Sequence, residues 1–213
     1  MNTSHYETVK NTVKDKAQLC IVTKRHTVDE IMPFYDLGER IFAENRADEL
    51  IPKAEQMPKD IQWHYIGHLQ RNKVRKVLPY VSMIQSLDSI GLADVLEKEA
   101  ARIDKVIPVL AEFHLASEDT NKSGLGKEDA KAFFDHCQTL DHIKLEGIMV
   151  MGPHTDDKER IAEVFNDAYA LFKELQETYG EEIRILSMGM SADYPIAVAC
   201  GSTMVRIGTY LFQ

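Results

Sequence analysis

Cysteine, long apolar runs and positive charge are all scarce in this sequence of 213 residues. Its three cysteines, Cys20, Cys137 and Cys200, are odd in number and lack the spacing of metal motifs, which argues against a disulfide framework. A reducing compartment, the cytoplasm, is therefore expected. No apolar run approaches the roughly 18 residues of a membrane span, and the polar start lacks the apolar stretch of a signal peptide.

Positive charge is limited to 25 Lys and Arg residues, against 34 Asp and Glu, for a net charge of −9. Surfaces that bind nucleic acid or anionic membranes need clustered positive charge, so neither partner is expected. The short basic stretch from Arg71 to Lys76 is interpreted as a solvated helix face. A single basic pocket for a small phosphate is compatible with this charge.

Linkers rich in Pro, Gly or Ser and low-complexity stretches are also lacking, which predicts one domain over residues 1–213. The apolar content of 44% and the charged content of 28% are those of an ordinary soluble globular protein. A chain of this length buries enough surface to fold without disulfides or structural metals.

The chain alternates short apolar runs with longer segments of helical periodicity. Eight strands are predicted, at 18–22, 40–43, 61–66, 81–85, 106–115, 144–149, 183–186 and 203–207. Eight helices are predicted, at 4–16, 28–37, 46–56, 69–78, 89–102, 127–140, 156–179 and 192–200.

Strands that are separated by helices imply parallel pairing through right-handed crossovers. Eight such units can close on themselves, so the prediction is a (β/α)8 barrel of the TIM type with an extra helix before the first strand. A doubly wound open sheet is the alternative.

Active sites of such barrels form at the C-terminal ends of the strands. Lys24 follows the first strand there. An apolar barrel mouth disfavours the charged form of a lysine, and a neutral amine is what Schiff-base chemistry with a carbonyl requires. A lysine exposed on a loop is the alternative interpretation.

The loops after the seventh and eighth strands contain the residue types of a phosphate site. Ser187-Met-Gly-Met-Ser191 leads into a predicted helix with Ser191 as its N-cap, and Gly208-Thr209 follows the last strand. Ordinary turn glycines and caps are the alternative. Because the eighth strand of a barrel lies beside the first, a phosphorylated aldehyde could span Lys24 and these loops.

Arg206 lies at the end of the last strand, where a buried arginine needs partners. An ion pair with Glu44 or Glu112 is one interpretation. The other is a hydrogen bond to a ring nitrogen or an acidic group of a ligand. Three histidines, His64, His68 and His114, lack a carboxylate-histidine motif, so no metal site is expected.

Several long segments together identify a family. The longest are 63–73 (WHYIGHLQRNK), 186–191 (LSMGMS) and 201–209 (GSTMVRIGT), with 42–45 (FAEN) and 121–124 (NKSG) as shorter ones. From about Leu19 to Gly208 the chain resembles the pyridoxal phosphate homeostasis proteins, which are relatives of the N-terminal barrel of alanine racemase.

The resemblance implies that pyridoxal 5'-phosphate (PLP) is the cofactor and that Lys24 holds it as a Schiff base. It implies a phosphate ligand at Ser187, joined by Gly208 and Thr209, and places Arg206 against the pyridine nitrogen. Asn45 is expected in the cofactor pocket.

Two departures from the family pattern concern the rim near Lys24. Arg25-His26-Thr27 stands where the family has threonine and soon a proline, and Ala43 stands where it has glycine. The first helix is also shorter than is usual. None of these differences removes a bonding group, so they put the shape of the rim in doubt but not the cofactor.

The resemblance implies a protein that binds, stores or delivers PLP, with PLP-dependent apo-enzymes as recipients, and that keeps vitamin B6 and amino-acid pools balanced. It implies at most a weak side reactivity and not an enzyme. Racemisation needs acid and base groups on both faces of the substrate, and only Lys24 is evident. A monomer is expected, because the second domain that forms a dimer surface in alanine racemase is lacking. The rival functions are an amino-acid racemase, a cofactor-free Schiff-base aldolase, and a purely structural or partner-binding barrel.

Overall fold

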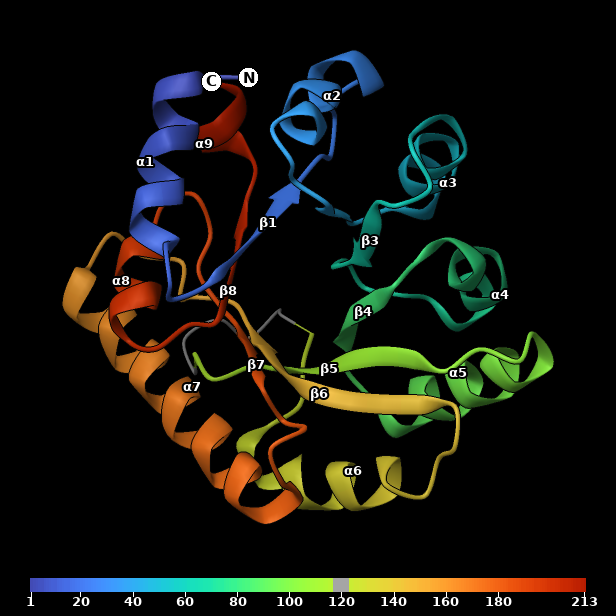
Figure 1. The fold of residues 1–213 in the computed structure, drawn as a ribbon. Coiled ribbons are helices and arrows are strands. Elements are labelled where there is room, and N and C mark those ends of the chain that lie inside the picture. Colours follow the sequence, from blue (N-terminus) through green and yellow to red (C-terminus); the bar gives the residue numbers. More distant parts are fainter. Residues whose placement is uncertain (117–122) are drawn as a thin grey trace.

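Each strand of the fold pairs in parallel with the next one along the chain, and the eighth pairs back with the first (Figure 1). The computed structural model describes residues 1–116 and 123–213. The strands are β1 Gln18–Val22, β2 Ile41–Glu44, β3 Gln62–Tyr65, β4 Met83–Leu87, β5 Ile107–Phe113, β6 Ile143–Val150, β7 Ile185–Ser187 and β8 Met204–Ile207. The predicted closed (β/α)8 barrel is confirmed, and the open sheet is wrong.

Helices surround this barrel (Figure 1). The α-helices are α1 Thr3–Val13, α2 Val28–Asp36, α3 Ala47–Gln56, α4 Val74–Val77, α5 Ile90–Arg102, α6 Ala130–Cys137, α7 Lys158–Tyr179, α8 Tyr194–Ala199 and α9 Thr209–Phe212. Short 3-10 turns, η1 Arg71–Lys73, η2 Leu78–Tyr80 and η3 Lys127–Asp129, flank α4 and precede α6. Among the described residues, no helix is both long and apolar enough to cross a membrane.

The extra helix before the first strand is present, as predicted, but it is shorter. Asn2 caps its start by accepting a hydrogen bond from the amide of His5. The helix ends at Val13, before Asp15 adopts a left-handed φ of 59°. The N-terminal end of α1 lies beside α9, a short helix that was not predicted (Figure 1). The amide of Asn2 donates there to the carbonyl of Leu211 at 2.8 Å.

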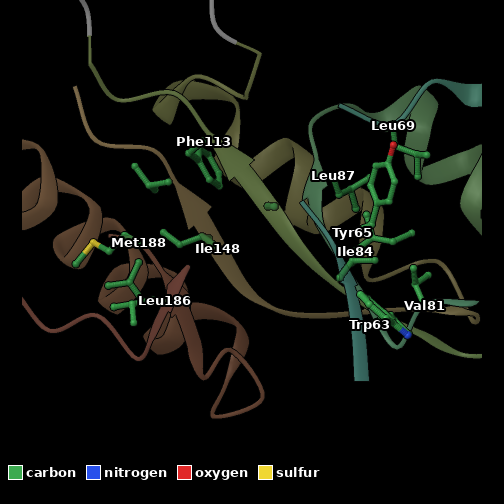
Figure 2. Close-up of a cluster of buried hydrophobic side chains, with 14 of the residues drawn as sticks. Trp63, Tyr65, Leu69, Val81, Ile84, Leu87, Phe113, Ile148, Leu186 and Met188 are labelled. Carbon is green, nitrogen blue, oxygen red and sulfur yellow. The ribbon is translucent and has the colours of Figure 1, made fainter. Parts of the chain in front are cut away.

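The strands bury both faces, because one faces the helices and the other faces the barrel interior. Figure 2 shows part of the outer layer, with Trp63, Tyr65 and Ile84 on one side and Phe113 and Leu186 on the other. The inner layer is a separate cluster of buried residues: Cys20, Val22, Ala43, Met83, Leu110, Met149, Ile185 and Met204. Alternate residues of one strand therefore belong to different layers, which fixes the residues that point into the barrel.

Candidate functional site

A cavity of about 240 Å³ opens at the C-terminal ends of β1 and β8. It is lined by Val22, Lys24, Ile66, Met190, Ser191, Ala192, Arg206, Gly208 and Thr209. Four of the six predicted cofactor residues, Lys24, Arg206, Gly208 and Thr209, are thus brought together. One wall is apolar, and the rest carries an amine, a guanidinium and two hydroxyls.

Lys24 continues the inward pattern of β1. Cys20 and Val22 point into the barrel, and Lys24 is the next residue of the same parity. Its side chain is exposed at the cavity, so it lacks the apolar burial that its position suggested. Among the described residues it has no hydrogen bond or ion pair, which leaves its amine free to meet a ligand.

The two loops that were predicted to hold a phosphate both reach this cavity. Ser191 and Thr209 present hydroxyls to it, and the Ser191 hydroxyl accepts a hydrogen bond from the amide of Tyr210 at 3.2 Å. A Cβ on Gly208 would meet the carbonyl oxygen of Val22 at 3.0 Å and the Val22 Cβ at 3.2 Å, so glycine lets the backbone of residue 208 lie this close to β1.

The predicted helix after β7 begins later than expected. Asp193 is the N-cap position of α8, and the first helical residue is Tyr194, so Ser191 lies in the preceding loop and is not the N-cap. The carboxylate of Asp193 accepts a hydrogen bond from the amide of Met190 at 2.6 Å, which closes a tight turn over 190–193. Ser191 thereby belongs to the cavity wall.

Arg206 is buried beneath the cavity and bonded to neutral acceptors. It donates to the carbonyl of Ser187 at 2.8 Å, to the Ser187 hydroxyl at 2.8 Å and to the carbonyl of Val150 at 3.0 Å. The ion pair with Glu44 is not formed, because Glu44 pairs with Lys53. Within the described part of the chain these bonds use three of the five guanidinium N–H groups, and Arg206 also lines the cavity.

Ser187 is fully buried and lies behind Arg206 instead of in the cavity wall. Its hydroxyl donates to the side-chain oxygen of Gln85 at 2.6 Å while it accepts from Arg206. The amide nitrogen of Gln85 in turn contacts Nδ1 of His64 at 2.9 Å. The predicted role of Ser187 as a phosphate ligand stays a prediction, and it would require this hydroxyl to give up a partner.

The chain Arg206, Ser187, Gln85, His64 crosses the barrel interior, and sequence reasoning did not find it. Each link donates in the same direction, which requires Nδ1 of His64 to accept and the ring to be neutral. Burial lowers the pKa of His64 to about 4, in agreement with that state. Glutamine in the middle of an apolar strand was the one available signal.

Glu112, at the end of β5, adds a second titrating group near the barrel mouth. Burial, together with the charge of Asp88, raises the pKa of Glu112 to about 7, although Arg206 and Ser123 oppose the shift. The Ser123 hydroxyl donates to Glu112 at 3.3 Å. Burial lowers the pKa of Arg206, whereas the charge of Glu112 raises it, so these two groups are electrostatically linked although they form no ion pair.

Asn45 lies in a neighbouring pocket and not in the Lys24 cavity. This pocket has a volume of about 420 Å³ and is lined by Asn45, Arg46, Ala47, Asp48, Tyr65, His68, Gln70 and Lys73. The side-chain oxygen of Asn45 is buried and has no hydrogen-bond partner among the described residues. Its place in the cofactor pocket stays a prediction.

The three histidines considered as metal ligands are dispersed. His64 is inside the barrel, and His68 is exposed and bonded to Asp88 at 3.0 Å. Within 1–116 and 123–213, no three His, Cys, Asp or Glu side chains gather as a metal site would require. Of the family segment 121–124, the first two residues, Asn121 and Lys122, lie outside the described part of the chain.

Comparison with known proteins gives relatives over nearly the whole chain. A pyridoxal phosphate homeostasis protein of Aquifex aeolicus is 37% identical over 197 residues, which cover 92% of this chain and 86% of that protein. The pyridoxal phosphate homeostasis protein of Synechocystis is 36% identical, with 98% and 96% covered.

Solved structures agree. PipY of Synechococcus elongatus, solved without PLP, superposes with a TM-score of 0.93 at 32% identity and 100% coverage of both chains. PipY with PLP bound superposes with a TM-score of 0.89 at 99% coverage. Alanine racemase of Clostridium difficile is only 17% identical and shares the fold, with a TM-score of 0.81 over 55% of its chain.

The family model for the alanine racemase N-terminal domain matches residues 3–213. Its span, the identity to the curated relatives and the closed barrel all agree. The chain therefore belongs to the alanine racemase N-terminal domain family and, within it, to the pyridoxal phosphate homeostasis proteins.

Proposed function

We propose that this protein binds PLP as a Schiff base on Lys24 and takes part in the intracellular homeostasis of the cofactor. One observation carries the proposal: Lys24 shares a cavity with Arg206, Gly208 and Thr209. PipY, at 32% identity, has been solved with PLP bound, and the curated relatives are named for PLP homeostasis.

The residues present fit the cofactor. When bound, PLP supplies an aldehyde on a pyridine ring and an anionic phosphate. Lys24 offers the amine, Val22 and Ile66 offer apolar contact, and the hydroxyls of Ser191 and Thr209 offer donors for a phosphate. Gly208 lines the cavity without a side chain, so its backbone can come close to the same group. The donor set is thus suited to both ends of PLP.

Arg206 favours binding over turnover. A guanidinium stays protonated, so a pyridine nitrogen facing its remaining N–H groups receives a hydrogen bond without gaining the proton. Racemisation also needs acid and base groups on both faces of a substrate. Of the described residues that line the cavity, the only titratable ones are Lys24 and Arg206. We therefore propose no physiological turnover, and steady conversion of L- to D-alanine above that of free PLP would contradict this.

Titration with PLP, followed by absorption, tests the proposal. The wild type is expected to develop a yellow absorption band that saturates with added PLP, and Lys24→Ala is expected to lack it. Lys73→Ala removes an exposed lysine from the neighbouring pocket and should behave as the wild type. A colourless wild type that takes up no PLP would overturn the proposal and favour a cofactor-free aldolase. PLP binding that is unchanged in Lys24→Ala would contradict a Schiff base on Lys24 and favour a purely structural or partner-binding barrel.

Delivery is the finer part of the proposal. We propose that PLP-dependent apo-enzymes receive the cofactor and that the protein works as a cytoplasmic monomer. The described residues expose few large apolar side chains, as expected without a large interface: Met1, Leu37, Ile90, Ile103, Val106, Tyr169 and Met190. Light scattering of the purified protein tests the monomer. Reactivation of an apo-enzyme by the loaded protein, faster than by free PLP at its dissociated concentration, tests delivery.

A further inference from the structure

The backbone turn that carries Lys24 is held from behind by side chains of β2 and α3. Thr23 is fully buried, and all of its polar groups are bonded. Its amide donates to the carbonyl of Ala43 at 3.0 Å, and its hydroxyl donates to Glu44 at 2.6 Å. Its carbonyl accepts a hydrogen bond from the ammonium of Lys53 at 2.8 Å. Thr23 is thereby fixed on three sides.

A second contact fixes the residue after Lys24. Arg25 adopts a left-handed φ of 66°, which costs a residue with a Cβ about 1 kcal/mol. Its amide donates to the carboxylate of Glu49 at 2.7 Å. Glu49 and Lys53 lie one turn apart on α3, with 3.5 Å between ammonium and carboxylate. The same helix face thus holds both neighbours of Lys24.

Glu44, Glu49 and Lys53 together form a brace behind residues 23–25. The ion pair between Lys53 and Glu44 at its centre is buried. The Lys53 ammonium lies 2.5 Å from a Glu44 oxygen, and their side chains are 10% and 0% exposed. Burying two charges is costly, and apolar residues of similar volume often serve stability as well or better. A buried pair directly beneath the Lys24 turn therefore calls for a role besides stability.

The side chain of Lys24 makes no hydrogen bond or ion pair with any described residue, so its direction into the cavity depends on the backbone at 23–25. We propose that Lys53, with Glu44 and Glu49, is a positioning group that aims the Lys24 amine at the carbonyl of its ligand. This inference rests on the proposed function. In that reaction the neutral Nζ attacks the aldehyde carbon, C=N replaces C=O, and water leaves with the oxygen and two amine protons.

The decisive variant removes the brace without leaving a buried charge. Lys53→Met alone strands Glu44, so a loss of folding stability is expected there. Glu44→Gln/Lys53→Met removes both charges and takes the ammonium donor from the Thr23 carbonyl, which keeps the amide of His26 at 3.1 Å. Lys105→Met is the matched control, because the Lys105 ammonium also donates to backbone carbonyls, those of Leu78 and Val81. These residues precede β4 and Lys105 precedes β5, so they lie at the opposite end of the barrel.

Two measurements separate positioning from stability. The rate of Schiff-base formation, from stopped-flow absorption after mixing with PLP, should fall about 10- to 100-fold in the double variant and stay within about twofold in Lys105→Met. Urea unfolding of all variants shows whether each is folded under those conditions. A double variant that is folded and reacts as fast as the wild type would overturn the inference.

A measurement without PLP keeps this inference distinct from the proposed function. Reductive methylation with ¹³C-formaldehyde labels lysine amines, and Lys24→Arg assigns the Lys24 signal. The double variant should shift that signal and Lys105→Met should not. If the wild type fails to bind PLP but this shift occurs, the proposed function fails and the brace stands. An unmoved Lys24 signal overturns the brace.

Discussion

The guanidinium of Arg206 donates two hydrogen bonds to one residue, Ser187, at 2.8 Å to its carbonyl oxygen and 2.8 Å to its hydroxyl. The Ser187 hydroxyl donates a hydrogen bond to the side-chain oxygen of Gln85, and Ser187 is fully buried. Ser191, four residues later, lies in the cavity wall. The two serines of this segment therefore have different surroundings, and we expect them to have different roles.

Replacing each serine by alanine separates these roles. Ser191→Ala should weaken PLP binding about tenfold, because a donor to the phosphate is lost, with a loss of folding stability within about 1 kcal/mol. Ser187→Ala should lower the free energy of unfolding by about 1–3 kcal/mol, since Arg206 and Gln85 each lose a partner in the buried interior. PLP titration and urea unfolding of both variants give the four values needed.

The opposite result is equally informative. A tenfold loss of PLP affinity in Ser187→Ala, with Ser191→Ala unchanged, would show that Ser187 leaves its partners to hold the phosphate. The direct role that the family resemblance implies for Ser187 would then be correct.

Glu112→Gln should stabilise the protein at alkaline pH. The pKa of Glu112 is raised by burial to about 7, above the 4.5 of an exposed carboxyl, so its contribution to stability is full below about 4.5 and is lost as the pH rises through about 7. Glutamine resembles the neutral acid and does not ionise. The free energy of unfolding should exceed that of the wild type by about 1–3 kcal/mol at pH 8 and be similar at pH 5.

Urea unfolding at several values between pH 5 and 8 checks this, with Glu146→Gln as the control. Glu146 is buried too, but it pairs with Arg184 at 2.7 Å, so its replacement removes an attraction and should give no gain at pH 8. A Glu112→Gln variant that is no more stable than the wild type at pH 8 would show that Glu112 ionises without cost.

His64 should make the protein sensitive to acid. Burial lowers its pKa to about 4 from 6.5, so its contribution to stability is present above about 6.5 and is lost as the pH falls through about 4. Protonation would also put a hydrogen where Nδ1 accepts from Gln85. The stability of the wild type relative to His64→Gln should therefore drop by about 1–3 kcal/mol between pH 7 and pH 4. A difference that is constant over this range would contradict the neutral ring.

The barrel could be predicted because its signals are local. The first strand, 18–22, agrees with β1 at both ends, since an apolar run of that length is bounded by polar residues. The predicted helix over 69–78 was less accurate, because the chain there forms η1, α4 and η2 in succession, with Pro79 in the first turn of η2. The four-residue α9 was too short to give a periodic pattern.

The site was predicted in part for a related reason. Lys24, Arg206 and Gly208 were placed at the C-terminal ends of the first and last strands, and these strands are neighbours in the closed barrel, so the residues share one cavity. Ser187 was placed in a loop because β7 was expected to end at Leu186, whereas it ends at Ser187. A shift of one residue turns a cavity residue into an interior one. The hydrogen bonds through Gln85 join strands far apart in sequence, and no local pattern reveals them.

Borohydride reduction of the PLP-loaded protein, followed by peptide mass analysis, tests the central claim most directly. Reduction should bleach the yellow band and leave one phosphopyridoxyl group on the peptide that contains Lys24. A label on another lysine, or none on a protein shown to be folded and saturated with PLP, would contradict the assignment of Lys24 as the residue that holds the cofactor.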